Sequence, residues 1–294
     1  MTTLARRAVS RRQRPLWMLA PGGVLLLVVI VLPLAVAVLV STLDLNQYTL
    51  RQWTDAPGVG LDNYVKAWQE TALPHAIWVT VGYAVIVTVA AVPLGLVAAL
   101  ATQQRFAGRG LVRSAFLIPY VLPAFVVGTV WRTILLPSGP ANGLLGEQYL
   151  WLNGPRAYWV LVLAQLWTSW PLLYLLALSG LQGINDDVHE AAALDGAEWW
   201  AKLRYVILPH LRGVLGLGMV IEFLHVLNSF TLPYVLFGVP APHDVEVLPV
   251  LTYVESFQNF KFGLSAAMAV LSLVLVAIPL SVYLRAVRLN RDED

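Results

Sequence analysis

Polar and aromatic side chains inside two long apolar runs are the residues of this sequence that could bind a solute. In the later run, four polar residues recur at i, i+3, i+6 and i+7, which a helix would bring to roughly one face: Glu222, His225, Asn228 and Ser229. In the earlier run, an amide and three aromatic groups lie close together: Gln165, Trp167, Trp170 and Tyr174. Polar residues within a membrane span usually face a packed interior or a cavity. Amides and carboxylates hydrogen-bond to hydroxyls, and aromatic faces pack against sugar rings. The two sets therefore predict a path for a sugar-like solute.

Each set also has a simpler interpretation. Polar side chains in membrane helices form hydrogen bonds between packed helices, and Trp and Tyr gather at membrane surfaces. The pattern does not separate cavity lining from helix–helix contact for Glu222 and Asn228. Arg132, near the end of another apolar run, could extend its side chain toward the membrane surface.

Other chemistries are excluded by what the sequence lacks. It has no cysteine, so disulfides, thiolate metal sites and cysteine nucleophiles are ruled out. The five histidines are scattered and no H-E-x-x-H motif is present, so no metal site is predicted. No catalytic constellation is apparent either. No G-x-x-x-x-G-K-[ST] phosphate loop occurs, so ATP hydrolysis would have to come from another subunit. The chain is thus not expected to be an enzyme or to hold a cofactor.

The elements that must position these residues are membrane spans. Of 294 residues, 58% are hydrophobic and 12% are charged, which is typical of integral membrane proteins. Apolar runs of span length predict six transmembrane helices, near 16–40, 77–101, 111–136, 157–181, 211–235 and 264–284. A cleaved signal peptide is the competing interpretation of the first run, but that run is too long for one. The polar segment 41–75 is too mixed to span, and a short interfacial helix is expected near 63–69.

The distribution of basic residues predicts the orientation of the spans. Fourteen of the nineteen lysines and arginines fall in the N-terminal tail, the 102–113 and 182–212 loops and the C-terminus. By the positive-inside rule this side faces the cytoplasm, so both termini are expected there. The predicted organisation is a basic cytoplasmic tail (1–15), a six-span domain (16–290) with a cytoplasmic loop at 182–212, and an acidic tail end (291–294). The expected location is the cytoplasmic membrane of a bacterium or archaeon, with several passes through it.

The loop before the fifth span is the most charged stretch among the apolar runs. Asp187 and Glu190 have the spacing of a capping box, which predicts a helix start there. Gly196 should end that helix after about two turns, and a second helical piece at 198–206 should lead into Leu208-Pro209. The alternative is an amphipathic loop at the membrane surface, with Trp199 and Trp200 among the lipid headgroups.

This loop resembles the EAA loop of ABC-importer permeases. The shared pattern is Glu190-Ala191-Ala192, then Gly196 after three residues, then Leu208-Pro209; Asp195 and Ala197 complete the common DGA form. Val206 replaces the usual isoleucine. Further segments resemble the carbohydrate branch of the family, near the first permease of maltose, trehalose and glycerol-3-phosphate systems: 60–64, Pro119, Trp131, Trp167, Pro171 and 180–184. Two departures are Asn185, where proline is common, and 238–242 (GVPAP), where Gly-Gly-Pro is frequent.

The resemblance implies an all-α, six-helix permease of the type I ABC-importer fold, with work divided among subunits. A second permease would complete the channel, two ATPase subunits would bind ATP and Mg, and an extracytoplasmic solute-binding protein would deliver the solute. Coupling to the ATPase would then be carried by Glu190, Ala191, Ala192, Asp195, Gly196, Ala197, Leu208 and Pro209. Alternatives are a proton-coupled secondary transporter with Glu222 and His225 as a relay, a polytopic membrane enzyme, or a permease for a non-sugar solute such as a glycerophosphodiester.

Overall fold

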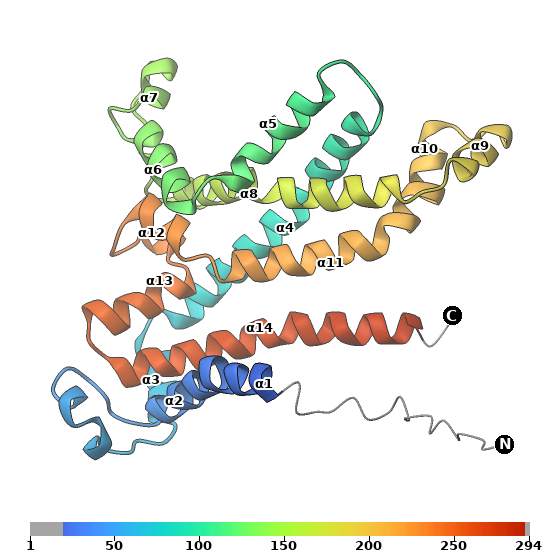
Figure 1. Ribbon diagram of the computed structural model, residues 1–294. Coiled ribbons are helices and arrows are strands. Elements are labelled where there is room, and N and C mark those ends of the chain that lie inside the picture. Colours follow the sequence, from blue (N-terminus) through green and yellow to red (C-terminus); the bar gives the residue numbers. More distant parts are fainter. Residues whose placement is uncertain (1–19, 292–294) are drawn as a thin grey trace, which may run out of the picture.

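The fold is made of helices, as the computed structural model shows for residues 20–291 (Figure 1). Within these residues no β-strand occurs, and a single isolated bridge joins Leu43 and Gly58. The predicted basic tail (1–15) lies outside the described residues, as does the tail end (291–294) except for Arg291. The expectation of an all-α chain is confirmed for the described part.

Five stretches of the described chain are long and apolar enough to cross a membrane: Ala20–Ser41, Leu73–Gln103, Pro155–Gln182, Trp199–Leu227 and Phe262–Arg285. A sixth span arises if the bent pair Arg109–Val121 and Ala124–Leu145 is counted as one. Each of the six predicted spans therefore has a counterpart.

The helices between Ala20 and Gln182 are α1 (Ala20–Leu26), the π turn η2 (Leu27–Val31), α2 (Leu32–Ser41), the 3-10 turn η3 (Leu50–Asp55), α3 (Asp62–Glu70), α4 (Leu73–Gln103), α5 (Arg109–Val121), α6 (Ala124–Leu135), α7 (Pro140–Leu145) and α8 (Pro155–Gln182).

The rest of the chain is built in the same way. Its helices are α9 (Asp186–Leu194), α10 (Trp199–Lys202), the π turn η4 (Leu203–Ile207), α11 (Leu208–Leu227), α12 (Thr231–Phe237), the 3-10 turn η5 (His243–Val245), α13 (Leu248–Tyr253), the π turn η6 (Val254–Gln258) and α14 (Phe262–Arg291). The predicted short helix near 63–69 is confirmed as α3.

The third predicted span, 111–136, is not one straight helix. Its first part, α5, meets the stretch Ala124–Leu145, which begins with α6, at an angle of 91°. Leu122 has an extended backbone (φ −68°, ψ 135°) at the end of α5, and Pro123 follows it. A proline lacks an N–H and disfavours helical backbone in the residue before it, which explains the break.

The fifth predicted span, 211–235, is wrong in its extent. The helical stretch begins earlier, at Trp199, and ends at Leu227, and α12 is a separate helix that packs against α6. The chain leaves the helix at 228–230 because the ring of Pro233 would clash with the carbonyl of Ser229 in a continuous helix. In α12, Pro233 lies in the first turn, where a proline is tolerated.

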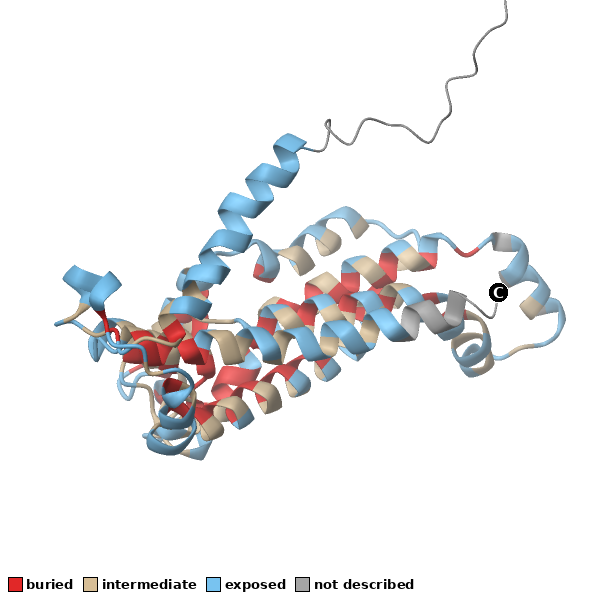
Figure 2. Cartoon of the chain, turned by 90° about the horizontal axis from the view of Figure 1, so that it is seen from below, coloured by how far each residue is buried: buried red, intermediate tan, exposed pale blue. Residues whose placement is uncertain are grey.

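The core lies where α4 and α8 cross. An ideal Cβ added to Gly95 of α4 would lie 2.6 Å from the backbone nitrogen of Tyr174 in α8, so only glycine permits this close approach. Tyr83, Leu161 and Leu173 are fully buried around the crossing. In Figure 2 the buried residues, in red, gather in the interior of the bundle, interspersed with intermediate and exposed positions.

The first span lies apart from this core. Along α1 and η2 every residue is exposed, as the pale blue helix next to the grey N-terminal trace shows (Figure 2). The following helix, α2, packs against α14. At its end the chain is tied down by Asn63 of α3, whose side-chain nitrogen donates to the carbonyls of Ser41 and Leu43, each across 2.9 Å. The stretch is thus anchored at one end and leaves a long apolar surface uncovered by its own chain.

Candidate functional site

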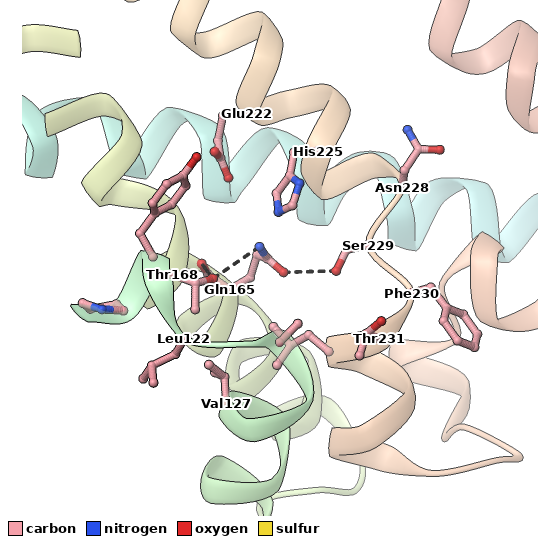
Figure 3. Close-up of a pocket in the computed structure, with 14 residues that line it drawn as sticks. Leu122, Val127, Gln165, Thr168, Glu222, His225, Asn228, Ser229, Phe230 and Thr231 are labelled. Atoms are coloured by element: carbon pink, nitrogen blue, oxygen red, sulfur yellow. Dashed lines mark hydrogen bonds between the residues drawn. The ribbon is translucent and has the colours of Figure 1, made fainter. Parts of the chain in front are cut away.

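A cavity of about 610 Å³ lies between α5, α6, α8, α11 and the start of α12 (Figure 3). Its lining combines apolar residues with hydroxyl, amide, carboxyl and imidazole groups. The lining residues are Pro119, Tyr120, Leu122, Ala124, Val127, Gln165, Thr168, Glu222, His225, Asn228, Ser229, Phe230, Thr231 and Leu232. A concave site with a few convergent polar groups is the usual form of a small-molecule site.

Five of the eight residues predicted for the solute path meet in this cavity. Glu222 and His225 project from the last turns of α11, and Asn228 and Ser229 follow in the break before α12 (Figure 3). Asn228 ends the helix: its side-chain nitrogen donates to the carbonyl of Leu224 across 2.8 Å. The fifth residue, Gln165, enters from α8. The spacing at i, i+3, i+6 and i+7 therefore places these side chains on one cavity wall, even though the helix stops before the last two.

Gln165 connects three elements around the cavity. Its amide oxygen accepts a hydrogen bond from the hydroxyl of Tyr83 in α4 across 2.7 Å and from that of Ser229 across 3.2 Å. Its amide nitrogen lies 3.4 Å from the hydroxyl oxygen of Thr168 and 3.3 Å from that of Ser169. Both ends of the amide are thus satisfied by protein groups, which fixes the wall formed by α8 and the break after α11.

Glu222 differs from Gln165 in this respect. Its side chain is 1% exposed, yet its Oε1 atom has no hydrogen-bond partner within the described residues. His225, one turn later in α11, is exposed, as is Asn228. A buried carboxyl oxygen without a donor is costly, and such groups in native structures need an explanation.

The three predicted aromatic residues of α8 do not line this cavity. Trp167 packs edge-on against Trp131 of α6, with ring centroids 6.5 Å apart. Trp170 packs against Phe116 of α5 with centroids 5.3 Å apart, and the hydroxyl of the buried Tyr174 accepts a hydrogen bond from Thr102 of α4 across 3.2 Å.

Helix periodicity gives the reason. At about 100° per residue, positions 167, 170 and 174 lie roughly 140–200° around the helix from position 165, on the opposite face. The aromatic groups that do line the cavity are Tyr120 and Phe230. Tyr120 stands between Pro119 and Pro123 at the bend of α5 and α6, and Phe230 lies in the break after α11. A search for proline-flanked breaks would have pointed to both.

The charged loop forms a second candidate site. It begins with α9 and turns at Gly196, which has φ +71°, a left-handed conformation that favours glycine. The backbone N–H of Asp195 donates to the carbonyl of Ala191 across 3.0 Å, and that of Ala197 to the carbonyl of Ala192 across 2.9 Å. These two bonds close the end of α9, as in helix ends that use a left-handed glycine. The predicted helix–glycine–helix arrangement is confirmed.

The predicted capping box is wrong. The helix begins at Asp186, one residue before the expected cap, and the side-chain oxygen of Asn185 accepts a hydrogen bond from the N–H of Asp187 across 3.3 Å. Asn185 therefore performs the capping role that the sequence assigned to Asp187, since asparagine is among the best N-cap residues.

The second half of the loop continues into the membrane stretch. From Trp199 the chain runs through α10, η4 and α11 without interruption of the helical stretch, and Leu208-Pro209 open α11. The π turn η4 directly precedes Leu208-Pro209, and its wider turn accommodates a proline that cannot donate a hydrogen bond to the preceding turn. Trp199 and Trp200 are 54% and 72% exposed.

All eight residues assigned to coupling lie at the surface or partly so. Ala192 and Ala197 are half-buried and the other six are exposed: Glu190, Ala191, Asp195, Gly196, Leu208 and Pro209. Figure 1 places α9 and α10 at the same end of the bundle as the C-terminal end of α14, and away from α6, α7 and α12. The loop is therefore open to a partner at that end.

Comparisons with known proteins concern the chain as a whole. Residues 91–290 match the family model described as "Binding-protein-dependent transport system inner membrane component". The chain is 31% identical over 245 residues to a trehalose/maltose transport system permease protein of Thermococcus litoralis, covering 81% of this chain and 82% of that protein. It is 29% identical over 286 residues to a trehalose transport system permease protein of Mycobacterium tuberculosis, covering 94% and 89%.

A solved structure supports the fold. A chain of a bacterial ABC transporter involved in the import of the acidic polysaccharide alginate superposes with a TM-score of 0.75 at 20% identity, covering 92% of this chain and 94% of that one. At this level of identity the likeness concerns the fold.

Proposed function

The chain belongs to the family of inner membrane components of binding-protein-dependent transport systems, and from that premise we propose that it carries a sugar. As a permease of an ABC importer it is a transport subunit and not an enzyme. In the proposed assembly a second permease completes the path, two ATPase subunits bind ATP and Mg, and an extracytoplasmic binding protein delivers the sugar. This chain itself holds no cofactor. The assembly lies in the cytoplasmic membrane of a bacterium or archaeon.

One observation carries the proposed sugar path: the cavity between α8 and α11. Its polar groups include hydroxyls and amides of the kind that recognise sugar hydroxyls, from Gln165, Thr168, Asn228 and Ser229. Tyr120 and Phe230 supply the aromatic surfaces that the sequence had assigned to α8. Two similar permeases are named for trehalose or trehalose/maltose transport, which supports the same class of cargo.

The loop around α9 is the proposed contact with the ATPase. Its helix is short and is closed by Asn185 at one end and by the turn at Gly196 at the other. After this turn, a continuous helical stretch runs from Trp199 into α11. A shift of the ATPase surface against α9 would pass through this tight turn to α11 and its cavity wall. Glu190 is exposed on α9 and is proposed to bond with the ATPase surface.

The apolar surface of α1 and η2 fits lipid contact or the second permease. None of the most apolar part of this span is buried within the chain, whereas about half of the span in α8 is. A span this exposed needs a cover of lipid or of another subunit, as every membrane helix does.

Uptake into proteoliposomes tests the function. Vesicles holding this chain, the second permease and the ATPase, with ATP inside and the binding protein and radiolabelled trehalose outside, are expected to accumulate sugar. Accumulation should require ATP and survive an uncoupler. Accumulation driven by a proton gradient without the ATPase would instead support a secondary transporter with Glu222 and His225 as a proton relay.

The loop assignment has its own test. Glu190→Lys reverses the charge of an exposed residue on α9, and the variant is expected to insert normally but to retain less ATPase during purification. Retention of the ATPase at the wild-type level, with unchanged uptake, would remove the proposed docking role.

A further inference from the structure

The cavity between α8 and α11 has an unusual charge balance. Of the fourteen residues that line it, Glu222 and His225 are the ones with an ionisable carboxyl or imidazole group, and none is lysine or arginine. The remaining polar lining consists of neutral amides and hydroxyls. An anionic solute entering this part of the path would therefore meet a carboxyl group without a permanent positive charge from this chain to balance it.

The nearby arginines are engaged elsewhere. Arg113 of α5 donates to the backbone carbonyl of Thr102 across 2.7 Å, and Arg132 of α6 donates to that of Val235 across 3.1 Å. Neither is among the residues that line the cavity. The two helices that form the opposite wall thus direct their described guanidinium groups toward backbone oxygens and not toward a solute.

Glu222 brings a buried carboxyl group to the cavity wall. It is 1% exposed, it lines the cavity, and its Oε1 atom has no partner among the described residues. Its neighbour in the wall, Gln165, is by contrast fully bonded to protein groups. A buried acceptor without a donor is satisfied by a ligand O–H, and an uncharged polyhydroxyl solute supplies several.

Building on the proposed function, we infer that Glu222 determines specificity by charge: the cavity accepts uncharged sugars and rejects phosphorylated sugars, uronates and other anions. A hydroxyl of an uncharged sugar can donate to the Glu222 carboxylate without electrostatic cost, whereas the negative charge of a phosphate or carboxylate on the solute is repelled by it. The fold does not impose this choice, since the structurally similar transporter imports an acidic polysaccharide. Glu222 also separates a sugar from a glycerophosphodiester, because the latter carries a negative charge.

The test compares trehalose with trehalose 6-phosphate, which differ by one charged group. Binding of each to the purified complex of both permeases and the ATPase is measured by saturation-transfer NMR, which detects weak binding. The binding protein is left out so that its own selection does not contribute. A like charge held within a few ångströms should weaken binding of the phosphate by roughly tenfold or more relative to trehalose.

Glu222→Gln is the decisive variant because it keeps the size of the side chain and one acceptor oxygen and removes the charge. The ratio of the two affinities should fall to within about threefold, mainly through tighter binding of the phosphate. Glu255→Gln is the matched control. Glu255 is another buried carboxyl, placed in η6 outside the cavity lining and 3.4 Å from the Lys261 nitrogen. Its removal should leave the ratio unchanged.

The outcomes separate the two levels of the proposal. If the wild-type complex binds neither sugar, the proposed sugar path fails together with the inference. If it binds both equally, or if Glu222→Gln keeps the wild-type ratio, the role of Glu222 fails while the sugar path stands.

Discussion

The hydroxyl of Ser229 donates a hydrogen bond to the amide oxygen of Gln165 across 3.2 Å, joining the break after α11 to the middle of α8. The same oxygen accepts the hydroxyl of Tyr83 from α4. One buried amide thereby holds together three elements around the cavity. Since α11 continues directly from the loop that contains α9, this amide lies where a movement of α11 would change the cavity wall.

Gln165→Ala is expected to lower the thermal unfolding temperature of the purified protein. The substitution leaves the fully buried Tyr83 hydroxyl without its acceptor, at a cost of about 1–3 kcal/mol. In a Tyr83→Phe background the same substitution should cost less, because no hydroxyl remains to be left unpaired. Equal losses in the two backgrounds would show that the Tyr83–Gln165 bond contributes little.

Gly196→Ala is expected to weaken ATP-driven uptake without changing the amount of protein in the membrane. No atom lies within 4 Å of an added Cβ, so the effect comes from the left-handed backbone alone, about 1–2 kcal/mol. Gly196→Asn should be milder, since asparagine tolerates this conformation. Gly213→Ala, at a helical glycine in α11 that also has open space, is the control and should be harmless. If uptake by the Gly196→Ala variant equals uptake by the Gly213→Ala control, the turn does not depend on glycine.

Asn185→Ala is expected to loosen α9, because the cap accepts the N–H of Asp187 and its loss costs about 1 kcal/mol of helix stability. Faster hydrogen exchange of the α9 amides would show this. Asn185→Asp keeps the acceptor and should behave as the wild type. Asp187→Ala should accelerate this exchange less than Asn185→Ala does. If Asp187→Ala has the larger effect instead, Asp187 is the cap, as the sequence predicted.

Much of the fold followed from the sequence because span length and helix period are local properties. The six apolar runs and the glycine turn at Gly196 depend on residues close together in the chain, and each has its counterpart in the structure. The fifth span was misplaced because hydropathy does not register a break. The polar pair Asn228-Ser229 is too short to interrupt an apolar run averaged over a span length, and Pro233 acts on a carbonyl four residues earlier.

The cavity was predictable on one wall. The positions of Glu222, His225 and Asn228 share a face of one helix, so the helical period is enough to predict that they lie on the same wall. On α8, Trp170 and Tyr174 lie near Gln165 in the sequence but on the opposite face of the helix, where they contact α5 and α4. The contributions of α5 and α6 depend on a 91° bend, which no local pattern specifies in angle or direction.

Glu246→Gln is expected to change the pH dependence of stability. Glu246 lies in the segment between η5 and α13, and burial raises the pKa of its carboxyl above the ordinary 4.5; Glu255 adds to this, while His243 and His75 oppose it. With a folded pKa above the unfolded one, the folded state binds more protons between the two values, so its stability falls as pH rises through that window. The Glu246→Gln variant has no carboxyl at this position, so its folding stability does not fall with pH for this reason. Its unfolding temperature should therefore gain on the wild type as pH increases from about 4 to 7, a range set around the unfolded pKa. Glu147→Gln, at an exposed carboxyl, controls for the removal of a negative charge by itself. A Glu246→Gln curve parallel to the wild type would show that this carboxyl is solvated in the folded protein.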